Sequence, residues 1–339
     1  MASVISTDPA VVVEGVVPPF NKADQQPVED VTSEQFKGLL AGLLENMGIS
    51  PLEEQRPCDD LAMAIYARLG PVLPEEHQAF ARAVCKVGAL VGIYFYPCHS
   101  EFIQRLIGVY TAVYLVLDDL GHTMVDSIAQ YRQQLVRPNS PVAGASEEPP
   151  TVFSLLTSLF EEFDREFPTA CANKLFASVV NSLASLELEY DESTIFSSVA
   201  SPTFPKYFRN MNGSSEAYVY FLLPHEVSSM SRLKRLLQAV PELLDITDEI
   251  NDLFSFYKES VVGLERETFV YQKARVDGSS AYQTLQMLSG EILRRERLIQ
   301  CILQSDPVLA HLASMYIRGQ IAFYLSSERY RLSELAWIA

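Results

Sequence analysis

The chain has 339 residues, of which 26 are basic and 43 are acidic, so its net charge is −17 with neutral histidines. This charge excludes nucleic acid and anionic membrane surfaces as general partners, because both would repel an acidic protein. The hydrophobic share of 48% excludes global disorder, and the 15 glycines are too few for a turn-rich all-β protein of this length.

Residues 1–30 contain four prolines among acidic and small residues and show no hydrophobic period. We expect them to form a flexible N-terminal tail, followed by one α-helical domain over residues 31–339. The start of the chain lacks the basic residues and the long apolar core of a signal peptide. The longest clean apolar run, from Leu106 to Leu117, is shorter than the ~20 residues that span a bilayer. The five cysteines are scattered without a CxxC spacing, which disfavours disulfides and zinc clusters, so we expect a soluble cytoplasmic protein.

Helical periodicity begins near Thr32 and continues almost to the end of the chain. The sequence Thr32-Ser33-Glu34-Gln35 offers a helix cap, and leucines then recur at helical spacing. No run alternates with period two and no internal repeat is evident, so the sequence predicts an all-α fold. A proline-rich loop is expected over 138–150, a further helix near Pro205 and a helix start at Pro241. The long predicted helices cover residues 58–69, 75–95, 100–120, 123–136, 151–165, 168–190, 215–236, 241–261, 280–304 and 307–332.

The apolar run Gly108–Leu117 leads directly into Asp118 and Asp119. A helix that is apolar on every side is expected in the middle of a helical protein. Two carboxylates at its C-terminal end repel each other and face the negative pole of the helix dipole, which alone costs up to ~1 kcal/mol. A divalent cation would reverse the sign of both effects. The alternative is that both carboxylates reach solvent at a helix end.

A second polar pattern lies on the helix expected from Pro241. Asn251, Ser255 and Glu259 are four residues apart and form one stripe that drifts by ~40° per step. An amide oxygen, a hydroxyl and a carboxylate are hard oxygen ligands that suit Mg²⁺. Lys258 lies beside the stripe, within reach of a phosphate oxygen. The alternative is a solvated polar helix face, which the neighbouring aromatic residues make less natural.

Together, the two motifs resemble the metal-binding motifs of class I terpene cyclases. Further sequences extend the resemblance to the trichodiene synthase family of fungal-type sesquiterpene cyclases, in the family's order and from about Ile93 onward. They are Tyr96-Pro97, LVLDDLGH at 115–122, FPKYFRNMNG at 204–213, NDLFSFYKE at 251–259 and ERYRLSE at 328–334. The resemblance implies a single-domain class I terpenoid synthase, an all-α helical bundle around a central active-site cavity.

The resemblance also implies a metal site. Farnesyl diphosphate would bind in the mouth of the bundle with three Mg²⁺ ions. Asp118 matches the first ligand of the acid-rich motif. The triad Asn251, Ser255 and Glu259 matches the ligands of the remaining Mg²⁺.

The chain departs from the family pattern at two places. The acid-rich motif often has a third acid where this chain has His122, and Asp126, one turn later, is an unconvincing substitute. Asp119 matches a supporting acid of the same motif. In the C-terminal motif, Ser327 and Glu328 replace the family's acid and arginine, so no role is carried over to them.

Other matched residues would contact diphosphate. Lys258 matches a diphosphate-binding lysine, and Arg209 matches the arginine that senses diphosphate. Arg329-Tyr330 matches the doublet that hydrogen-bonds diphosphate when the site closes. Asn212 and Gly213 match the linker and effector positions, where a glycine would let the helix bend.

We therefore expect a sesquiterpene synthase, a lyase that ionises farnesyl diphosphate with Mg²⁺, cyclises the cation and releases diphosphate. Aromatic faces would stabilise the cation without trapping it. The aromatic candidates are Phe95, Tyr110, Tyr114, Tyr218, Phe221, Tyr316 and Phe323. One alternative is a chain-elongating prenyltransferase, which would need a second aspartate-rich motif, and another is a catalytically inactive binding protein on the same fold. A homodimer is compatible with these expectations.

Overall fold

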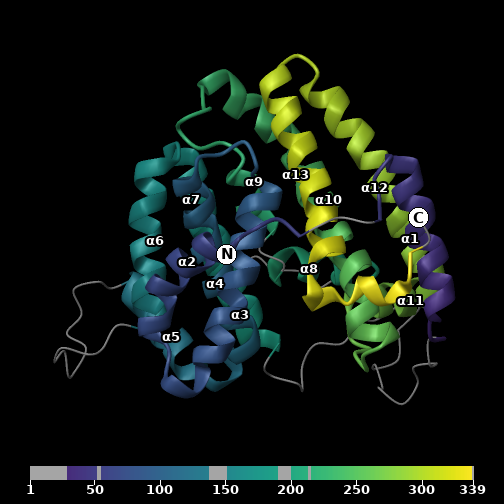
Figure 1. The fold of residues 1–339 in the computed structure, drawn as a ribbon, viewed down its shortest axis with the longest axis horizontal. Helices are drawn as coiled ribbons and strands as arrows, with labels where there is room; N and C mark the ends of the chain where they lie inside the picture. The colour runs from purple at the N-terminus through teal and green to yellow at the C-terminus, as the bar shows by residue number, and fades with distance from the viewer. Residues whose placement is uncertain (1–28, 52–54, 137–150, 190–199, 213–214, 338–339) are drawn as a thin grey trace, which may run out of the picture.

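The computed structural model describes residues 29–51, 55–136, 151–189, 200–212 and 215–337 (Figure 1). These residues form helices joined by turns and contain no β-strand, which confirms the predicted all-α fold. The tail expected over residues 1–30 and the loop expected over 138–150 lie almost entirely outside the described residues. The helices are α1 (Ser33–Met47), α2 (Asp59–Leu69), α3 (Gln78–Phe95), α4 (Glu101–Leu120), α5 (Val125–Val136), α6 (Val152–Glu166), α7 (Thr169–Glu189), α8 (Phe204–Asn212), α9 (Ser215–Tyr220), α10 (Met230–Phe256), α11 (Phe269–Asp277), α12 (Ala281–Leu303) and α13 (Pro307–Ser326). Short helical turns are η2 (Gly70–Val72), η3 (Glu75–His77), η4 (Gly121–Thr123), η5 (Tyr257–Val261), η6 (Glu328–Tyr330) and η7 (Leu332–Leu335).

Local sequence sets several helix ends as predicted. At the start of α1, the Thr32 side chain accepts a hydrogen bond from the Gln35 backbone N–H at 3.2 Å, and Gln35 Oε1 accepts one from the Thr32 N–H at 2.9 Å. This reciprocal pair satisfies donors that a helix start leaves unpaired. The helix ends at Gly48, whose φ of 63° is left-handed backbone that glycine adopts without strain. The cap expected at Thr32 is therefore confirmed.

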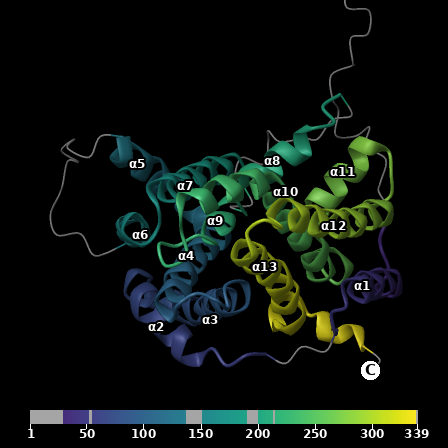
Figure 2. The ribbon, with the colours of Figure 1, turned by 90° about the horizontal axis from the view of Figure 1, so that it is seen from above.

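Two close backbone contacts set the spacing of the helices that matter most for function. A Cβ placed on Gly88 of α3 would lie 2.3 Å from the carbonyl oxygen of Gly108 on α4. A Cβ placed on Gly319 of α13 would lie 1.8 Å from the carbonyl oxygen of Tyr94 on α3. Neither position has room for a side chain, so α3 packs directly on α4 and α13 packs directly on α3 (Figure 2).

The helix around Pro241 differs from the prediction. The sequence predicted one helix over 215–236 and another from Pro241, whereas α9 stops at Tyr220 and α10 runs without interruption from Met230 through Pro241 to Phe256. Ser229 starts α10, because its hydroxyl accepts a hydrogen bond from the Arg232 N–H at 3.2 Å. A proline inside a helix loses one backbone hydrogen bond but does not always end the helix.

One further helix was missed, and one further boundary was predicted wrongly. The missed helix is the short α11. The helix predicted over 307–332 stops at Ser326, and the chain continues in the short turns η6 and η7, with Arg331 in a left-handed conformation at φ 61°. The chain thus turns just where the predicted Arg329-Tyr330 doublet lies.

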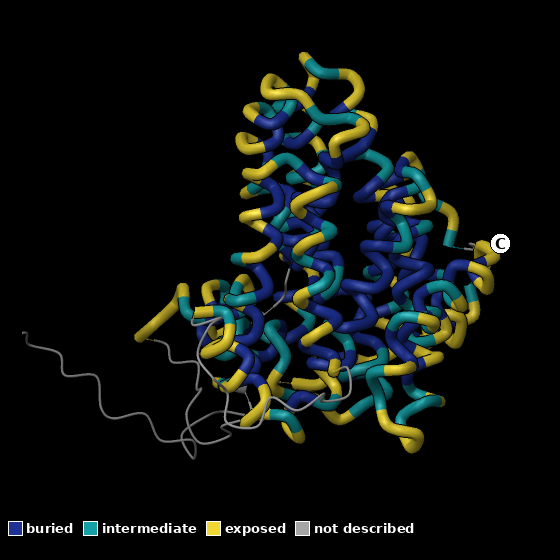
Figure 3. The backbone as a smooth tube through the Cα atoms, turned by 90° about the vertical axis from the view of Figure 1, so that its left-hand side faces the viewer, coloured by how far each residue is buried: buried dark blue, intermediate teal, exposed yellow. Residues whose placement is uncertain are grey.

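Buried residues follow the inward faces of the helices, with exposed residues on the outside (Figure 3). Among the described residues, the segment Glu75–Phe95 is long and apolar enough to cross a membrane, with a mean hydropathy of 1.2. In the structure 56% of that segment's apolar window is buried inside the protein. The core helix of a soluble protein has the same properties, so this segment is weak evidence for a membrane span.

Candidate active site

The helices surround a cavity of about 580 Å³. Its walls come from α3, α4, α10 and α13, with α8, α9 and α11 contributing further residues. The predicted site residues that line it are Asp118, Arg209, Asn251, Lys258, Glu259, Arg329 and Tyr330. Asp118 lies near the end of α4, Glu259 just after α10 and Arg329 just after α13, so the C-terminal ends of these three helices meet at the cavity.

Ser255 and Gly213 stand apart from that set. Ser255 is buried behind the cavity surface, where its hydroxyl donates to Glu259 Oε2 at 3.0 Å. Gly213 lies outside the described residues, and so does the side chain of Asn212, the last residue of α8.

The acid-rich motif ends α4 as predicted. Asp118 lies at the cavity surface, where partial loss of solvation raises the pKa of its carboxyl group. The charge of Asp119 raises this pKa further, and the attraction of Arg329 acts in the opposite direction. Asp119 does not line the cavity, but its Oδ2 lies 3.8 Å from an Arg329 nitrogen. His122 and Asp126 are exposed and do not line the cavity. The environment of Asp118 therefore favours a bound cation, which would relieve the repulsion between neighbouring carboxylates.

A change of helix type positions the second motif. After Phe256, α10 continues as the π-helical turn η5, in which the Val262 N–H donates to the Tyr257 carbonyl, five residues earlier, at 2.9 Å. A π-helical turn is wider than an α-helical one, so successive side chains rotate less around the axis. This slower rotation offsets the ~40° drift of residues spaced four apart in an α-helix. Ser255 and Glu259 consequently face the same direction.

The triad residues fit a Mg²⁺ ion. Within the described ranges, no group of three His, Cys, Asp or Glu side chains is arranged to hold a metal. The triad instead offers one carboxylate and two neutral oxygens, which are hard ligands of the kind that Mg²⁺ prefers. The 3.0 Å between Ser255 Oγ and Glu259 Oε2 matches the distance of about 3.0 Å between adjacent ligands of an octahedral ion with bonds of about 2.1 Å. Asn251 Oδ1 accepts a hydrogen bond from Arg209 at 2.8 Å. The Asn251 oxygen could therefore bind a metal ion in place of the hydrogen bond that it now accepts from Arg209.

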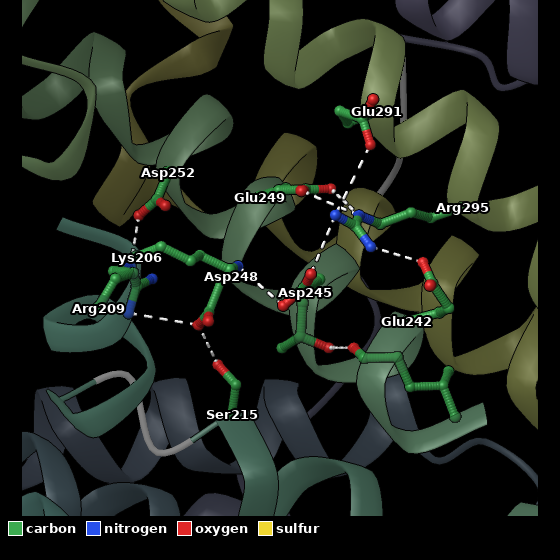
Figure 4. Close-up of polar contacts among 12 residues, drawn as sticks. Lys206, Arg209, Ser215, Glu242, Asp245, Asp248, Glu249, Asp252, Glu291 and Arg295 are labelled. Atoms are coloured by element: carbon green, nitrogen blue, oxygen red, sulfur yellow. Dashed lines mark hydrogen bonds and ion pairs between the residues drawn. The ribbon is translucent and has the colours of Figure 1, made fainter. Parts of the chain in front are cut away.

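Arg209 on α8 is held by the acidic face of α10 (Figure 4). Its Nε donates to Asp252 Oδ1 at 2.7 Å, and its Nη1 lies 3.4 Å from Asp248 Oδ1. Burial alone would lower the pKa of the Arg209 guanidinium, but the charges of Asp252 and Asp248 outweigh burial and raise it. Burial also raises the pKa of Asp252 to about 6, despite the attraction of Arg209. Arg209 therefore stays a cation at the cavity wall.

The same acidic face extends away from the cavity to α12. Asp245 lies 2.9 Å from Lys206 of α8 on one side and 2.9 Å from Arg295 of α12 on the other (Figure 4). Arg295 also donates to Glu249 at 2.9 Å and to Glu242. Lys206 and Arg209 belong to one short helix, so this ion-pair network links α8 to α10. Apart from Arg209, its members were not predicted, although acids recur at intervals of three and four residues along 242–252.

Two more of the predicted cations lie at the cavity, which Arg266 also lines. Lys258 Nζ is 2.9 Å from Glu259 Oε1 and lies 5.7 Å from the centre of the Tyr330 ring. Arg329 lines the same cavity from η6. The structure thus brings Arg209, Lys258 and Arg329 to one cavity, as the sequence motifs predicted.

Aromatic rings line the rest of the wall. Of the predicted rings, Phe95, Tyr114, Tyr218 and Phe323 line the cavity, whereas Tyr110, Phe221 and Tyr316 lie behind its surface. Phe95 and Phe323 meet edge to face, with ring centres 5.5 Å apart. Tyr324 was missed by the sequence argument, although it lies next to Phe323 and its hydroxyl accepts a hydrogen bond from Asn251 at 2.7 Å.

An all-α bundle whose aromatic cavity is lined by Asp118, by Asn251 and Glu259 of the triad and by the predicted cations defines a class I terpene synthase. The family model for trichodiene synthase (TRI5) matches residues 69–337. The chain therefore belongs to the trichodiene synthase family, which confirms the resemblance seen in the sequence.

Similar proteins agree with this assignment. The chain is 24% identical over 243 residues to an (E)-beta farnesene synthase of Metarhizium brunneum, covering 71% of each chain. It is 25% identical over 267 residues to the alpha-cuprenene synthase COP6 of Coprinopsis cinerea, covering 78% of each chain. The fold resembles the linalool/nerolidol synthase of Streptomyces clavuligerus in complex with 2-fluorogeranyl diphosphate, with a TM-score of 0.59 and 16% identity over 78% of this chain and 98% of that one. The predicted class I terpenoid synthase fold is thus confirmed.

Proposed function

We propose that this chain is a Mg²⁺-dependent sesquiterpene synthase that ionises farnesyl diphosphate, cyclises the resulting cation and releases diphosphate. The observation that carries the proposal is the meeting of Arg209, Lys258 and Arg329 with the two acidic motifs at the mouth of one cavity. A cavity of about 580 Å³ is within the range of about 300–1,000 Å³ that holds small-molecule ligands. The aromatic wall below the charged mouth suits a prenyl chain.

The metal would be held by Asp118 on one motif and by Asn251, Ser255 and Glu259 on the other. When bound, Mg²⁺ supplies positive charge that neutralises diphosphate and makes it a better leaving group.

The chain's own cations would assist that departure. Arg209 has five N–H donors, and its contacts with Asp252, Asp248 and Asn251 engage three of them, which leaves two for a phosphate oxygen. Lys258 is a compact charge that can follow the departing group. Arg329 lines the same cavity from η6. Fixed donors aimed at developing negative charge are the main source of rate enhancement in such a site.

The aromatic wall would protect and steer the cation. The rings of Phe95, Tyr114 and Phe323 border the cavity, and each face can attract a cation by roughly 0.5–2 kcal/mol. Rings neither add to a carbocation as readily as water nor remove its proton. The fold would therefore hold the prenyl chain in a coiled shape and exclude bulk water.

The first test incubates the purified protein and Mg²⁺ separately with geranyl, farnesyl and geranylgeranyl diphosphate and analyses the organic extract by gas chromatography and mass spectrometry. We expect a C15 terpene from farnesyl diphosphate. No terpene from any of the three substrates would overturn the proposal. Longer prenyl diphosphates formed when isopentenyl diphosphate is added would instead indicate a chain-elongating prenyltransferase.

A matched pair of variants tests the role of the cations. Arg329→Gln should lower kcat/KM by about 100-fold, because loss of one preorganised charge contact costs about 3 kcal/mol. Arg331→Gln is the control, since Arg331 is exposed and binds Glu334 at 2.7 Å rather than lining the cavity. Equal activity of the two variants would contradict the assignment of Arg329.

A further inference from the structure

One polar side chain on the cavity wall has no role in the proposed ionisation. Gln320 of α13 borders the cavity and is fully buried, with 0% of its surface exposed. No residue in the described part of the chain hydrogen-bonds to its Oε1 or to its Nε2. A buried amide that leaves both its acceptor and its donors unpaired is strongly unfavourable. The amide therefore needs a polar partner from outside the described residues, and a bound small molecule beside the cavity would supply one.

The neighbours on the same face of α13 make Gln320 the exception. Tyr316, one turn earlier, shares a hydrogen bond of 2.8 Å with Thr247 of α10. Tyr324, one turn later, accepts one of 2.7 Å from Asn251, also on α10. The polar groups above and below Gln320 are thus satisfied by α10, while the amide between them is not.

The position of Gln320 along α13 places it beside the prenyl chain rather than the diphosphate. Gln320 is six residues before the helix end at Ser326, a distance of ~9 Å along the axis. Arg329 and Tyr330 come after that end, at the charged mouth. Gly319 holds this part of α13 directly against α3, so the Gln320 backbone cannot move away from the cavity.

We propose that the Gln320 amide binds a water molecule that captures the carbocation, so that the product is a terpene alcohol. This inference rests on the proposed function. Both amide atoms are inaccessible to solvent, so the Gln320 side chain must shift slightly to admit a water molecule. That water can accept a hydrogen bond from Nε2–H and donate one to Oε1, and it keeps a second lone pair for the cation. An amide is neutral and a very weak base, so it holds the water without removing a proton from the cation.

The step balances without another reactant. The C–O bond of the prenyl diphosphate breaks, and its electron pair leaves with diphosphate. The lone pair of the bound water forms a new C–O bond to the cationic carbon. The proton that this oxygen then loses passes to the released diphosphate, a base that the reaction itself supplies.

The test measures products and diphosphate release together. Wild-type protein with Mg²⁺ is incubated with farnesyl diphosphate in oxygen-18 water, the extract is analysed by mass spectrometry, and released diphosphate is measured enzymatically. We expect a terpene alcohol that carries the heavy oxygen. Gln320→Leu should lower the ratio of alcohol to hydrocarbon by at least about tenfold, because it removes the hydrogen bonds that hold the water. Diphosphate release by this variant should stay within about threefold of wild type, since Gln320 does not contact the mouth.

Gln304→Leu is the matched control, because Gln304 is exposed at the end of α12 and should leave the product ratio unchanged. Circular dichroism verifies that each variant is folded, and Gln320→Asn, which retains an amide, should keep more alcohol than Gln320→Leu. Diphosphate release with hydrocarbon products alone from wild type would overturn the inference but leave the proposed function intact. An unchanged alcohol ratio in Gln320→Leu would also overturn it. Failure of wild type to release diphosphate from any prenyl substrate would instead overturn the proposed function.

Discussion

Replacing Glu249 by glutamine should stabilise the protein at pH 8 and have a much smaller effect at pH 5. Glu249 is 6% exposed and accepts hydrogen bonds from Arg295 Nε at 2.9 and 3.0 Å. Burial raises the pKa of its carboxyl group from 4.5 to about 7, because loss of solvation outweighs the attraction of Arg295. The protein therefore holds this acid in an environment that disfavours its charged form.

The sign and size of the effect follow from the pKa. The folded state binds this proton more tightly than the unfolded state, so the free energy of unfolding falls as the pH rises from about 4.5 to about 7. A pKa rise of about 2.5 corresponds to at most about 3 kcal/mol. Glu249→Gln removes that penalty, while Arg295 keeps Glu242 and Asp245 as partners. We expect a gain of about 1–3 kcal/mol at pH 8 and less than about 1 kcal/mol at pH 5, where the carboxyl group is neutral in the folded state but still largely ionised in the unfolded state.

The measurement is urea denaturation of both proteins at the two pH values. Glu291→Gln is the control of opposite sign, because a hydrogen bond from Arg294 lowers the pKa of Glu291. The stability that Glu291 contributes is present above its unfolded pKa and is lost as the pH falls through its lower folded pKa. Glu291→Gln should therefore weaken the protein slightly at pH 8. A loss of stability for Glu249→Gln at pH 8, or a gain equal at both pH values, would refute the reasoning.

Three further outcomes are expected. Asp118→Asn should lower kcat by about 100-fold or more, since it removes charge that the metal requires, while Asp126→Asn, outside the cavity, should keep wild-type turnover in the same steady-state assay. Ser255→Ala should raise the Mg²⁺ concentration for half-maximal activity by about tenfold in a metal titration, and an unchanged titration would remove Ser255 from the ligand set. Gly319→Ala should lower the free energy of unfolding by about 3 kcal/mol in urea, because its Cβ would overlap a backbone carbonyl of α3. Gly290→Ala, with nothing within 4 Å, should instead be neutral or stabilising by up to about 1 kcal/mol, and equal losses in both would contradict the packing argument.

Features with a local physical origin were predictable from the sequence. The cap at Thr32 and the helix α4, which carries Asp118 in its last turn, depend on residues within a few positions of each other. The spacing of Asn251, Ser255 and Glu259 likewise predicted a common face, although not the π-helical turn that aligns the last of them. The choice between an α-helical and a π-helical turn depends on packing that sequence periodicity does not contain.

Features that depend on tertiary contacts were missed or predicted wrongly. Pro241 is a helix-breaking signal by its local chemistry, but the buried residues on both sides of it hold α10 together. The partners of Arg209 come from a helix more than thirty residues later, and nothing near Arg209 in the sequence specifies them. In the sequence, Gln320 is an ordinary polar residue in an apolar helix. Only the structure shows that its amide is buried without a hydrogen-bond partner among the described residues.

The glycine contacts give the two sides of the cavity different mechanical properties. Where α3 meets α4 and α13, backbone touches backbone at Gly88 and Gly319, and no side-chain rotamer is available there to absorb a displacement. By contrast, α8 is attached to α10 partly through Lys206, a long and partly exposed side chain that can reorient while remaining paired with Asp245. One wall is therefore stiff and the other compliant. A prenyl chain that changes shape during its reaction would therefore contact a rigid wall formed by α3, α4 and α13. Changes in the volume of the prenyl chain would be accommodated by small movements of α8.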